Sequence, residues 1–169
     1  MQLRNALTTD AEALVELHHR AVHAVVHPAN PAAVLASWSP PTGPDRRAWM
    51  AERIADPANA VIVAEADGAI AGFVFAAPAA AWIRALYVDP RHARRGIGAA
   101  LLAAAAARLR AAGSPRAGLN ASLNAVGFYS ARGYRAVEAT TQLLGDGTRM
   151  ECMAMEALLD PGTPPESCS

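Results

Sequence analysis

The sequence contains no lysine, and all 15 of its basic residues are arginines. They are balanced by 15 aspartates and glutamates, so the chain carries no net charge at neutral pH. A balanced chain lacks the positive surface with which proteins bind nucleic acids or anionic membranes. The absence of lysine also excludes a Walker phosphate-binding loop, which needs a Gly-Lys-Ser/Thr sequence. We therefore expect no nucleic-acid partner and a site of local recognition.

Cysteine and long hydrophobic runs are also scarce. Cys152 and Cys168 are the only cysteines, and they lack the Cys-x-x-Cys spacing of a redox or metal pair, which excludes a disulfide framework. The alanine-rich run in the middle of the chain is interrupted by Arg108 and Arg110 before it reaches membrane-spanning length. Residues 1–14 lack the apolar core of a signal peptide. These absences predict a soluble, cytoplasmic protein without a membrane partner.

The length of 169 residues suits one domain with a full hydrophobic core. We expect this domain to cover residues 1–159. Residues 160–169 contain proline, glycine and serine but few residues that could join a core, so we expect a disordered tail.

The first part of the chain predicts two helices. Thr9 and Glu12 form a capping box ahead of apolar residues at helical spacing, which predicts a helix over residues 10–26. Five prolines then exclude long regular structure between residues 27 and 44. Asn30, followed by a proline, nevertheless predicts the start of a short helix over residues 32–38.

A third helix is expected near residues 45–55. Asp45 is suited to its N-cap position, because a carboxylate can accept hydrogen bonds from the free N–H groups of the first turn. The spacing of Trp49 and Ile54 predicts that both are buried.

The middle of the chain predicts an antiparallel hairpin. Two apolar, β-branched runs over residues 60–66 and 69–76 are joined by Asp67 and Gly68, a dipeptide typical of tight hairpin turns. Residues 82–88 form another predicted strand, which leads through a loop into a further helix.

The second half predicts the remaining elements by the same patterns. We expect a helix over residues 97–112, strands over residues 116–121, 134–143 and 149–157, and a short helix that ends at Gly133. A first strand is expected near residue 3. The order predicts a single-domain α/β fold with a mixed sheet of about six to seven strands and about four helices. One parallel crossover spans residues 82–121, and ligands of such sheets bind at the carboxyl ends of the strands.

Two glycines, Gly96 and Gly98, separate the predicted strand from the helix. A dinucleotide-binding fingerprint would need a third glycine or alanine where the chain has Leu101, so this interpretation is weak. Glycines still allow backbone N–H groups at a helix start to approach an anion, and Arg94 and Arg95 add positive charge. From these residues alone, glycines that merely soften a helix start remain an alternative.

Two stretches together resemble the core motifs of the GNAT superfamily of N-acetyltransferases. They are "IRALYVDPRHARRGIGAALL" at residues 83–102 and "LNASLNAVGFYSARGYRAV" at residues 119–137. The second motif is complete, and its matching residues are Asn124, Phe128, Tyr129, Gly133 and Tyr134. The resemblance extends over nearly the whole chain through the order of its elements.

The resemblance implies an acetyltransferase-like fold whose central parallel strands splay apart, with acetyl-coenzyme A as cosubstrate. The pantetheine arm would bind the main chain of Leu86 and Val88, and Asn124 would contact the same arm. Backbone amides over residues 93–98 would bind the pyrophosphate. The implied cofactor-binding residues are Leu86, Tyr87, Val88, Ala93, Arg94, Arg95, Gly96, Ile97, Gly98, Ala99, Asn124 and Tyr129. Ala93 stands where the family usually has glutamine or arginine, which removes one side-chain contact.

The resemblance also places Tyr129 at the family's general-acid position. A tyrosine is protonated at neutral pH and can donate its proton to a leaving thiolate. The alternative is that Tyr129 is a core aromatic residue like Phe128. A main-chain N–H group near residues 86–88 would polarise the acetyl carbonyl.

The base that would accept the proton of the amine is not evident. Many relatives have a glutamate where this chain has Trp82, which leaves Glu65 and the histidines of the first helix as candidates. His19, His23 and His27 recur at four-residue intervals, a spacing compatible with a metal site. Pro28 disfavours helix at His27, and no acidic or cysteine ligand is nearby, so we expect a pocket wall or surface and no metal.

These residues predict an N-acetyltransferase that moves an acetyl group from acetyl-coenzyme A to a primary amine of a small molecule or peptide, by direct attack in a ternary complex. Trp38 and Trp49 favour an apolar or aromatic acceptor. Two alternatives remain: a non-catalytic sensor of acetyl-coenzyme A, and a protein N-terminal or lysine acetyltransferase. A homodimer is also open, because dimers are common in the resembling family.

Overall fold

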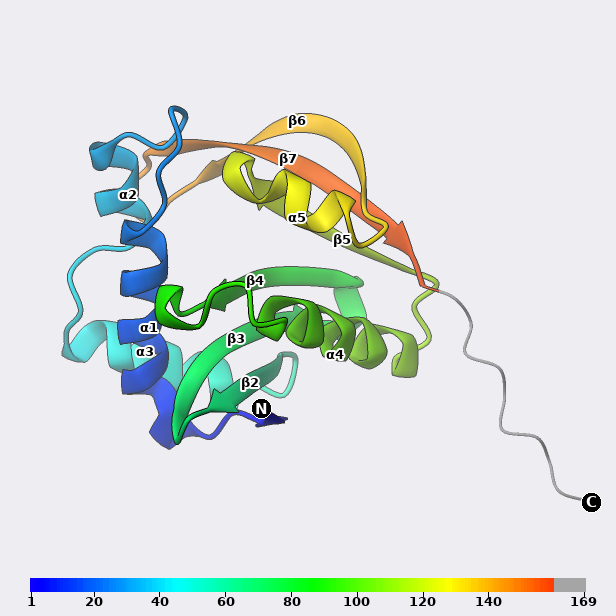
Figure 1. Cartoon of the computed structure of the whole chain (residues 1–169), viewed down its shortest axis with the longest axis horizontal. Helices are drawn as coiled ribbons and strands as arrows, with labels where there is room; N and C mark the ends of the chain where they lie inside the picture. Colours follow the sequence, from blue (N-terminus) through cyan, green and yellow to red (C-terminus); the bar gives the residue numbers. More distant parts are fainter. Residues whose placement is uncertain (160–169) are drawn as a thin grey trace, which may run out of the picture.

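A computed structural model describes residues 1–159, and the tail predicted to be disordered lies outside this range. The strands form one seven-stranded sheet in the order β1-β2-β3-β4-β5-β7-β6 (Figure 1). Their bounds are β1 Gln2–Asn5, β2 Ala60–Ala66, β3 Ala69–Ala77, β4 Trp82–Val88, β5 Arg116–Ser122, β6 Arg135–Leu143 and β7 Arg149–Leu158. The α-helices of the described chain are α1 Ala11–His23, α2 Ala32–Trp38, α3 Pro44–Ala55, α4 Ile97–Ala111 and α5 Val126–Ser130.

The predicted element order is confirmed, and so is the α/β class with a mixed sheet. The hairpin of β2 and β3 turns at Asp67 and Gly68, whose φ angles are 54° and 78°. Positive φ at both central residues is the signature of a type I′ turn, which matches the twist of the two strands. This is why an Asp-Gly dipeptide predicted the hairpin correctly.

The parallel neighbours β4 and β5 separate from each other along most of their length. Their register contains one residue pair, Trp82 with Gly118, and the Gly118 N–H donates to the carbonyl of Ala81 at 2.9 Å. A Cβ at Gly118 would lie 2.4 Å from the Trp82 ring, so the ring covers this glycine where the strands meet. Beyond the pair the strands diverge, which confirms the splayed parallel pair (Figure 1).

A β-bulge at Arg84 changes the side-chain alternation of β4. Opposite it on β3, Phe75 pairs with Ala85 and the next residue pairs with Ile83, so Arg84 has no partner on β3. Ile83 belongs to the apolar cluster beneath α4, whereas Ala85 packs against the cluster beneath α1. The bulge therefore re-aims the strand just where it begins to leave β5.

Helices cover both faces of the sheet. On one face, α4 and α5 pack through residues such as Leu101, Leu109 and Tyr129 against the strands. On the other face, α1 and α3 bury residues such as Leu14 and Met50. A third, smaller cluster joins Trp38 and Val34 of α2 to Leu144, Met150 and Cys152 beside β6 and β7.

Two predictions about the first helix were wrong in detail. Thr9 lies inside a 3₁₀ turn over Thr8–Asp10 and does not cap α1. The Asp10 carboxylate instead accepts from the Leu7 N–H at 2.7 Å and from the Arg4 guanidinium at 2.7 Å. The helix also ends at His23, earlier than predicted.

The second and third helices also begin differently from the prediction. The N-cap of α2 is Pro31 instead of Asn30, whose side chain is buried. α3 begins at Pro44 with Gly43 as N-cap, because proline suits the first helical position. Asp45 therefore lies in the first turn and is not the cap.

Trp49 is not buried, contrary to the prediction. Its side chain is 43% exposed, whereas the next residue, Met50, is 3% exposed and belongs to the core. The Trp49 ring lies between the guanidinium groups of Arg46 and Arg53, at 5.2 and 5.3 Å. Cation–π contact stabilises the ring at the surface, so helical periodicity alone placed the apolar stripe one residue off.

Candidate active site

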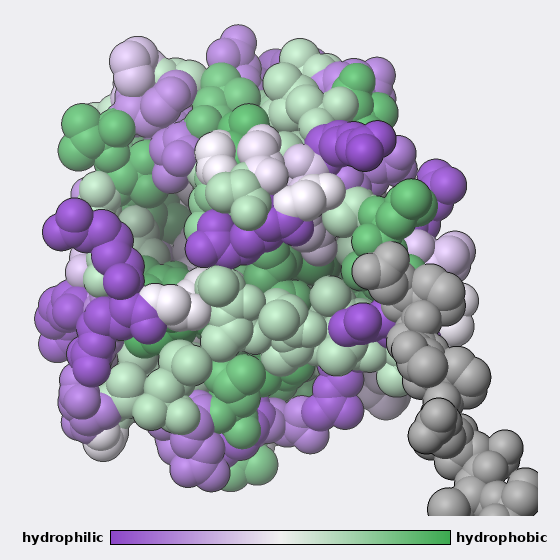
Figure 2. Space-filling model, turned by 45° about the vertical axis from the view of Figure 1, so that its right-hand side comes forward, coloured by the Kyte–Doolittle hydropathy of each residue, from purple (hydrophilic) through white to green (hydrophobic). Residues whose placement is uncertain are grey.

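A cavity of about 200 Å³ occupies the space where β4 and β5 separate. Figure 2 shows a hollow between the two halves of the molecule, with apolar side chains in it and hydrophilic ones along its rim. β4 and β5 line it on either side, and the end of α1, Trp38 of α2, Tyr129 of α5, and Gln142 and Met150 of the last two strands complete the wall. The cavity therefore exists only because segments from the whole chain meet there.

The cavity brings together five of the residues predicted to bind the cosubstrate. Leu86, Tyr87 and Val88 line it from β4, and Asn124 and Tyr129 line it from the second sequence motif. The two motifs, which are separated in sequence, thus form opposite walls of one cavity. The predicted residues from Ala93 to Ala99 are not part of this lining and lie in the loop before α4 and in its first turn.

The loop before α4 exposes a series of free backbone donors. Among the described residues, none of the N–H groups from Arg94 to Ala99 donates to a protein acceptor, whereas the Ala100 N–H donates to the Gly96 carbonyl at 3.0 Å. The first N–H groups of any helix lack intrahelical partners, and they carry the positive end of its dipole. Free amides at the start of a helix form a suitable site for a phosphate anion.

Ala93 differs from the residues that follow it in the loop. Its N–H donates to the Pro90 carbonyl at 3.2 Å, so this amide is already bonded within the chain. The free amides begin at the next residue, Arg94, whose φ of 60° turns the chain toward α4.

Glycine occupies positions 96 and 98 for different structural reasons. Gly96 has a φ of 80°, a conformation that side chains with a Cβ rarely adopt. Gly98 is tightly packed, because a Cβ there would lie 3.1 Å from the Phe128 ring and 3.5 Å from Val88. The glycine at 98 therefore lets the start of α4 pack against α5, the helix that carries Tyr129.

Arg94 and Arg95, the two arginines of this loop, differ in their contacts. The Arg95 guanidinium donates to the Asp67 carboxylate at 2.7 Å and lies 2.9 Å from the His92 ring. The Arg94 side chain is exposed and makes no hydrogen bond or ion pair to another residue within 1–159. Arg94 is therefore the arginine whose charge is available to a ligand.

Asp89, which the sequence patterns did not single out, fixes the loop between β4 and α4. Its carboxylate is fully buried and accepts from the Arg91 N–H at 3.0 Å, from the Arg91 guanidinium at 2.8 Å and from the Arg20 guanidinium at 2.9 Å. The Arg91 side chain, the Arg91 N–H and Arg20 hold the pKa of this carboxyl well below its usual range. The charged aspartate thus ties α1 to the loop.

Tyr129 is 8% exposed and lines the cavity. Its ring packs edge-to-face against Phe128 at 5.0 Å and Tyr134 at 5.7 Å, and its hydroxyl bonds to no other residue that the structure describes. Burial raises its pKa well above the usual value, with the neighbouring tyrosines adding to the effect. The group is therefore protonated at physiological pH and can donate a hydrogen bond into the cavity.

A buried polar network supports the wall opposite Tyr129. The Trp38 indole N–H donates to the Tyr87 hydroxyl at 3.0 Å, and the Tyr87 ring meets the His18 ring edge-on at 4.5 Å. His18 Nδ1 lies 3.0 Å from the Ser39 hydroxyl. Burial, together with smaller effects of the nearby Arg46, His19 and His23, lowers the pKa of His18 to about 3, so the imidazole is neutral. Helical spacing marked His19 and His23 but gave no sign that His18 is the buried one.

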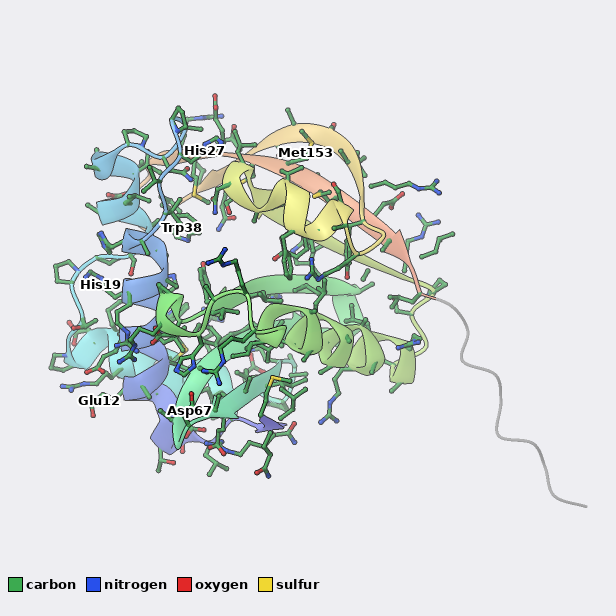
Figure 3. The ribbon with its side chains drawn as sticks, in the orientation of Figure 1. Glu12, His19, His27, Trp38, Asp67 and Met153 are labelled. Carbon is green, nitrogen blue, oxygen red and sulfur yellow. The ribbon has the colours of Figure 1, made fainter. Side chains whose placement is uncertain are left out.

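The candidate bases and metal ligands do not reach the cavity. His23 Nε2 lies 2.9 Å from the Ser39 carbonyl, His27 Nδ1 accepts from the Ala29 N–H, and His19 lies on the outer side of α1 (Figure 3). No group of three or more potential ligands is placed for a metal ion within residues 1–159. Glu65 is bonded to Arg4 near the far edge of the sheet.

A second asparagine supports Asn124. Asn30 is 4% exposed, and its Nδ2 donates to the Asn124 Oδ1 at 3.4 Å, which joins the loop before α2 to the second motif. The Asn30 Oδ1 atom is buried and has no partner among the described atoms. Asn30 therefore orients the side chain of Asn124 and does not cap a helix.

A mixed sheet whose central parallel strands separate around a cavity, with free amides at a helix start beside it, defines a class of protein. It is an acetyltransferase-like α/β fold with a splayed parallel strand pair. The sequence matches the family description "Acetyltransferase (GNAT) domain" over residues 44–157, which covers most of the chain. The chain therefore belongs to the GNAT family of acetyltransferases, and it uses acetyl-coenzyme A as cosubstrate.

Solved structures share the fold. A GCN5-related N-acetyltransferase from Rhodopseudomonas palustris is 24% identical, with 94% of this chain and 95% of that chain covered and a TM-score of 0.84. The ribosomal-protein-alanine N-acetyltransferase from Brucella melitensis is 21% identical, with 94% and 100% covered and a TM-score of 0.70. The PaiA N-acetyltransferase from Thermoplasma acidophilum, in complex with coenzyme A, is 18% identical, with 93% and 98% covered and a TM-score of 0.67.

Two further searches gave negative results, one among curated proteins and one among the helices of the described chain. The comparison with curated proteins found no match. Among residues 1–159, no helix is both long and apolar enough to cross a membrane.

Proposed function

We propose that this enzyme acetylates a primary amine of a small molecule or peptide by direct attack of the amine on the thioester, with both substrates bound together. The observation that carries the proposal is the cavity between β4 and β5. It is lined by Tyr129 and Asn124 on one side and by Leu86 and Val88 on the other.

The cosubstrate would bind along three groups of donors. The free amides from Arg94 to Ala99, with the exposed Arg94 side chain, would hold the pyrophosphate at the positive end of α4. The main chain of Leu86 and Val88 faces the gap left by β5. The pantetheine arm would bind there in the place that a neighbouring strand would occupy. Asn124, supported by Asn30, would bind the same arm.

Tyr129 would assist departure of the sulfur. As the amine nitrogen bonds to the acetyl carbon and the carbon–sulfur bond breaks, the hydroxyl donates its proton to the sulfur and regains one from the acylated nitrogen. Because burial raises the pKa of Tyr129, its proton would move only as negative charge develops on the sulfur. The products are an N-acetyl compound and a free thiol, so the protons balance.

The cavity favours an amine of low basicity. The described residues that line it include no aspartate, glutamate or histidine that could accept a proton from an ammonium group. A lysine-like amine with a pKa of about 10.4 costs roughly 4.6 kcal/mol to deprotonate at pH 7, whereas a peptide α-amine with a pKa of about 7.8 costs about 1 kcal/mol. A peptide α-amine therefore reaches its neutral form without a base from the protein.

The test is thiol release from acetyl-coenzyme A over a panel of amines, together with a melting-temperature screen against coenzyme A. We expect turnover with α-amines and a melting-temperature increase with coenzyme A. Tyr129→Phe should retain the melting-temperature increase and lose at least tenfold in kcat, because the ring remains and the donor is removed. Full kcat in this variant would remove Tyr129 from the mechanism.

Acetylation of protein N-termini is a second candidate function. The Brucella melitensis neighbour is a ribosomal-protein-alanine N-acetyltransferase, and an N-terminal amine has the low pKa that this cavity favours. Peptides that begin with different residues belong in the panel for this reason. A non-catalytic sensor, the third alternative, would bind coenzyme A and form no product with any amine.

A further inference from the structure

We propose that the acceptor is an amino acid with an apolar side chain, and that Arg84 binds its carboxylate beside the amine to be acetylated. This inference rests on the proposed function and names the class of its acceptor. It makes Arg84 a specificity-determining residue, distinct from the groups that bind the cosubstrate.

Arg84 is the one charged residue among the described residues that line the cavity. It is exposed, and no ion pair or hydrogen bond in the described chain engages its guanidinium, although many of the other arginines are paired. An arginine presents a planar set of donors that matches a carboxylate in a bidentate arrangement. Its charge is thus free for an anionic group inside the cavity.

The position of Arg84 separates it from the phosphate-binding amides. It precedes Val88 by four residues of strand, which corresponds to about 13 Å at roughly 3.3 Å per residue. The free amides begin still further along the chain, at Arg94. Arg84 is therefore at the end of β4 remote from the pyrophosphate, and its bulge lies where β4 leaves β5.

Other residues that line the same cavity suit the remainder of an amino acid. On β5, Leu119 and Ala121 pack in the cluster beneath α4, so Asn120 between them points to the opposite face and lines the cavity. Gln142 adds a second neutral amide. Trp38, labelled beside α2 in Figure 3, together with Val25 and Met150 forms an apolar wall for a side chain.

Charge decides between acceptor classes. A polyamine or a lysine-rich peptide would bring a second cation into a cavity that has an arginine and no carboxylate, which disfavours binding. An amino acid brings a carboxylate that Arg84 neutralises. The guanidinium also favours the neutral form of the neighbouring amine, which is the form that attacks. One side chain thus contributes to both binding and nucleophile activation.

The experiment compares L-leucine with L-leucinamide and 3-methylbutylamine as acceptors at saturating acetyl-coenzyme A. The wild type should give at least 30-fold higher kcat/KM with leucine than with either analogue that lacks the carboxylate. The amine of leucinamide is less basic than that of leucine. A preference for leucine over leucinamide therefore cannot arise from basicity.

Arg84→Gln should lower kcat/KM for leucine about 30-fold and leave leucinamide within threefold of the wild-type value. Arg116→Gln is the matched control, because Arg116 is an exposed arginine of the neighbouring strand β5 that does not line the cavity. It should leave both acceptors unchanged. Equal wild-type rates for leucine and leucinamide, or equal losses with both in Arg84→Gln, would overturn the inference while the proposed acetyl transfer stands.

Binding gives a readout that does not need turnover. N-acetyl-L-leucine and N-acetyl-L-leucinamide, added to the coenzyme A-loaded protein, should bind with a preference for the acid that Arg84→Gln abolishes. If this preference appears but no amine is ever acetylated, the proposed function fails and the carboxylate site stands. If neither preference nor turnover is seen, both are wrong.

Discussion

Gly98 is the residue at which the two sequence motifs pack closely, because a Cβ there would press on the Phe128 ring. The prediction at this position compares Gly98→Val with Ala93→Gly. The valine must displace Phe128, because a Cβ at 98 already lies 3.1 Å from the ring, and it shifts the start of α4 with its free amides. We expect about 1–3 kcal/mol loss in the free energy of unfolding and at least tenfold weaker coenzyme A binding.

Ala93→Gly should change coenzyme A binding by less than threefold, since the Ala93 N–H is bonded to Pro90 and the residue offers no polar side chain. Calorimetry on both variants checks the contrast. Equal effects would contradict the account in which the backbone binds the phosphates.

Single residues could be predicted from the sequence where a motif carried them. Tyr129 and Asn124 lie in the cavity, as the second motif implied. His18 and Asp89 could not be found in this way, because their significance comes from partners far along the chain, Tyr87 in one case and Arg20 in the other. Periodicity likewise could not show that two arginines hold Trp49 at the surface.

At the scale of elements, Asp89 joins α1 to the loop before α4. Its folded-state pKa is depressed, so the stability that it contributes is present above its unfolded pKa of about 3.9 and is lost as the pH falls below that value. Asp89→Asn should therefore lower the free energy of unfolding by about 2 kcal/mol near pH 7. The difference in Tm from the wild type should shrink as the pH is lowered from 5 to 3.

Thermal unfolding of both proteins across this range measures the effect. Arg110→Gln, at the exposed end of α4, is a suitable control and should show no such pH dependence. A constant difference in Tm between wild type and Asp89→Asn at all pH values would contradict the role of the charge.

β4 and β5 meet at the contact of Trp82 with Gly118. Gly118→Ala places a Cβ within 2.4 Å of the ring, so the ring must move, and we expect a loss of about 1–3 kcal/mol in the free energy of unfolding. Trp82→Leu removes the ring, and in that background the Gly118→Ala substitution should cost much less. Denaturant unfolding of the four proteins of this cycle gives the coupling, and additive effects would contradict it.

Elements were predicted well where local chemistry determines them. The β2–β3 hairpin follows from two residues that accept positive φ, and α4 follows from its alanine-rich composition. Helix starts were predicted less well, because Asp10 caps the 3₁₀ turn before α1 with the help of Arg4, and because Pro44 rather than Asp45 determines where α3 begins.

At the scale of the whole molecule, the described residues that line the cavity include no aspartate, glutamate or histidine, and this has a consequence for the pH dependence of the reaction. His18 has a pKa of about 3 and stays neutral throughout the usual range, so it adds no step. We expect kcat/KM to rise with pH with a single apparent pKa, that of the free acceptor amine. Profiles for two acceptors of different basicity should be displaced by the difference in their pKa values.

A pKa near 6 to 7 that is the same for every acceptor would indicate a protein base and contradict this account. Arg84→Gln is informative in the same experiment. It should lower the value of kcat/KM for acceptors that carry a carboxylate and leave the apparent pKa of the profile, which is that of the free amine, unchanged.

The order of strands and helices could be predicted from the chain, but the cavity itself could not. Its wall combines the end of α1, Trp38 of α2, two separated strands, α5 and the last hairpin, and no local pattern reports how these meet. The expectation that the central parallel strands splay apart came from the family resemblance. The missing carboxylate and the unpaired Arg84 became visible only in three dimensions.

The most direct test of the central claim follows coenzyme A release and acetylated product together, in one reaction of the full-length protein with acetyl-coenzyme A and L-leucine. We predict one N-acetyl product for each thiol released, with no thiol released when the amine is omitted. Saturable binding of acetyl-coenzyme A without any acetylated product from leucine, the other amines or the peptides would contradict it.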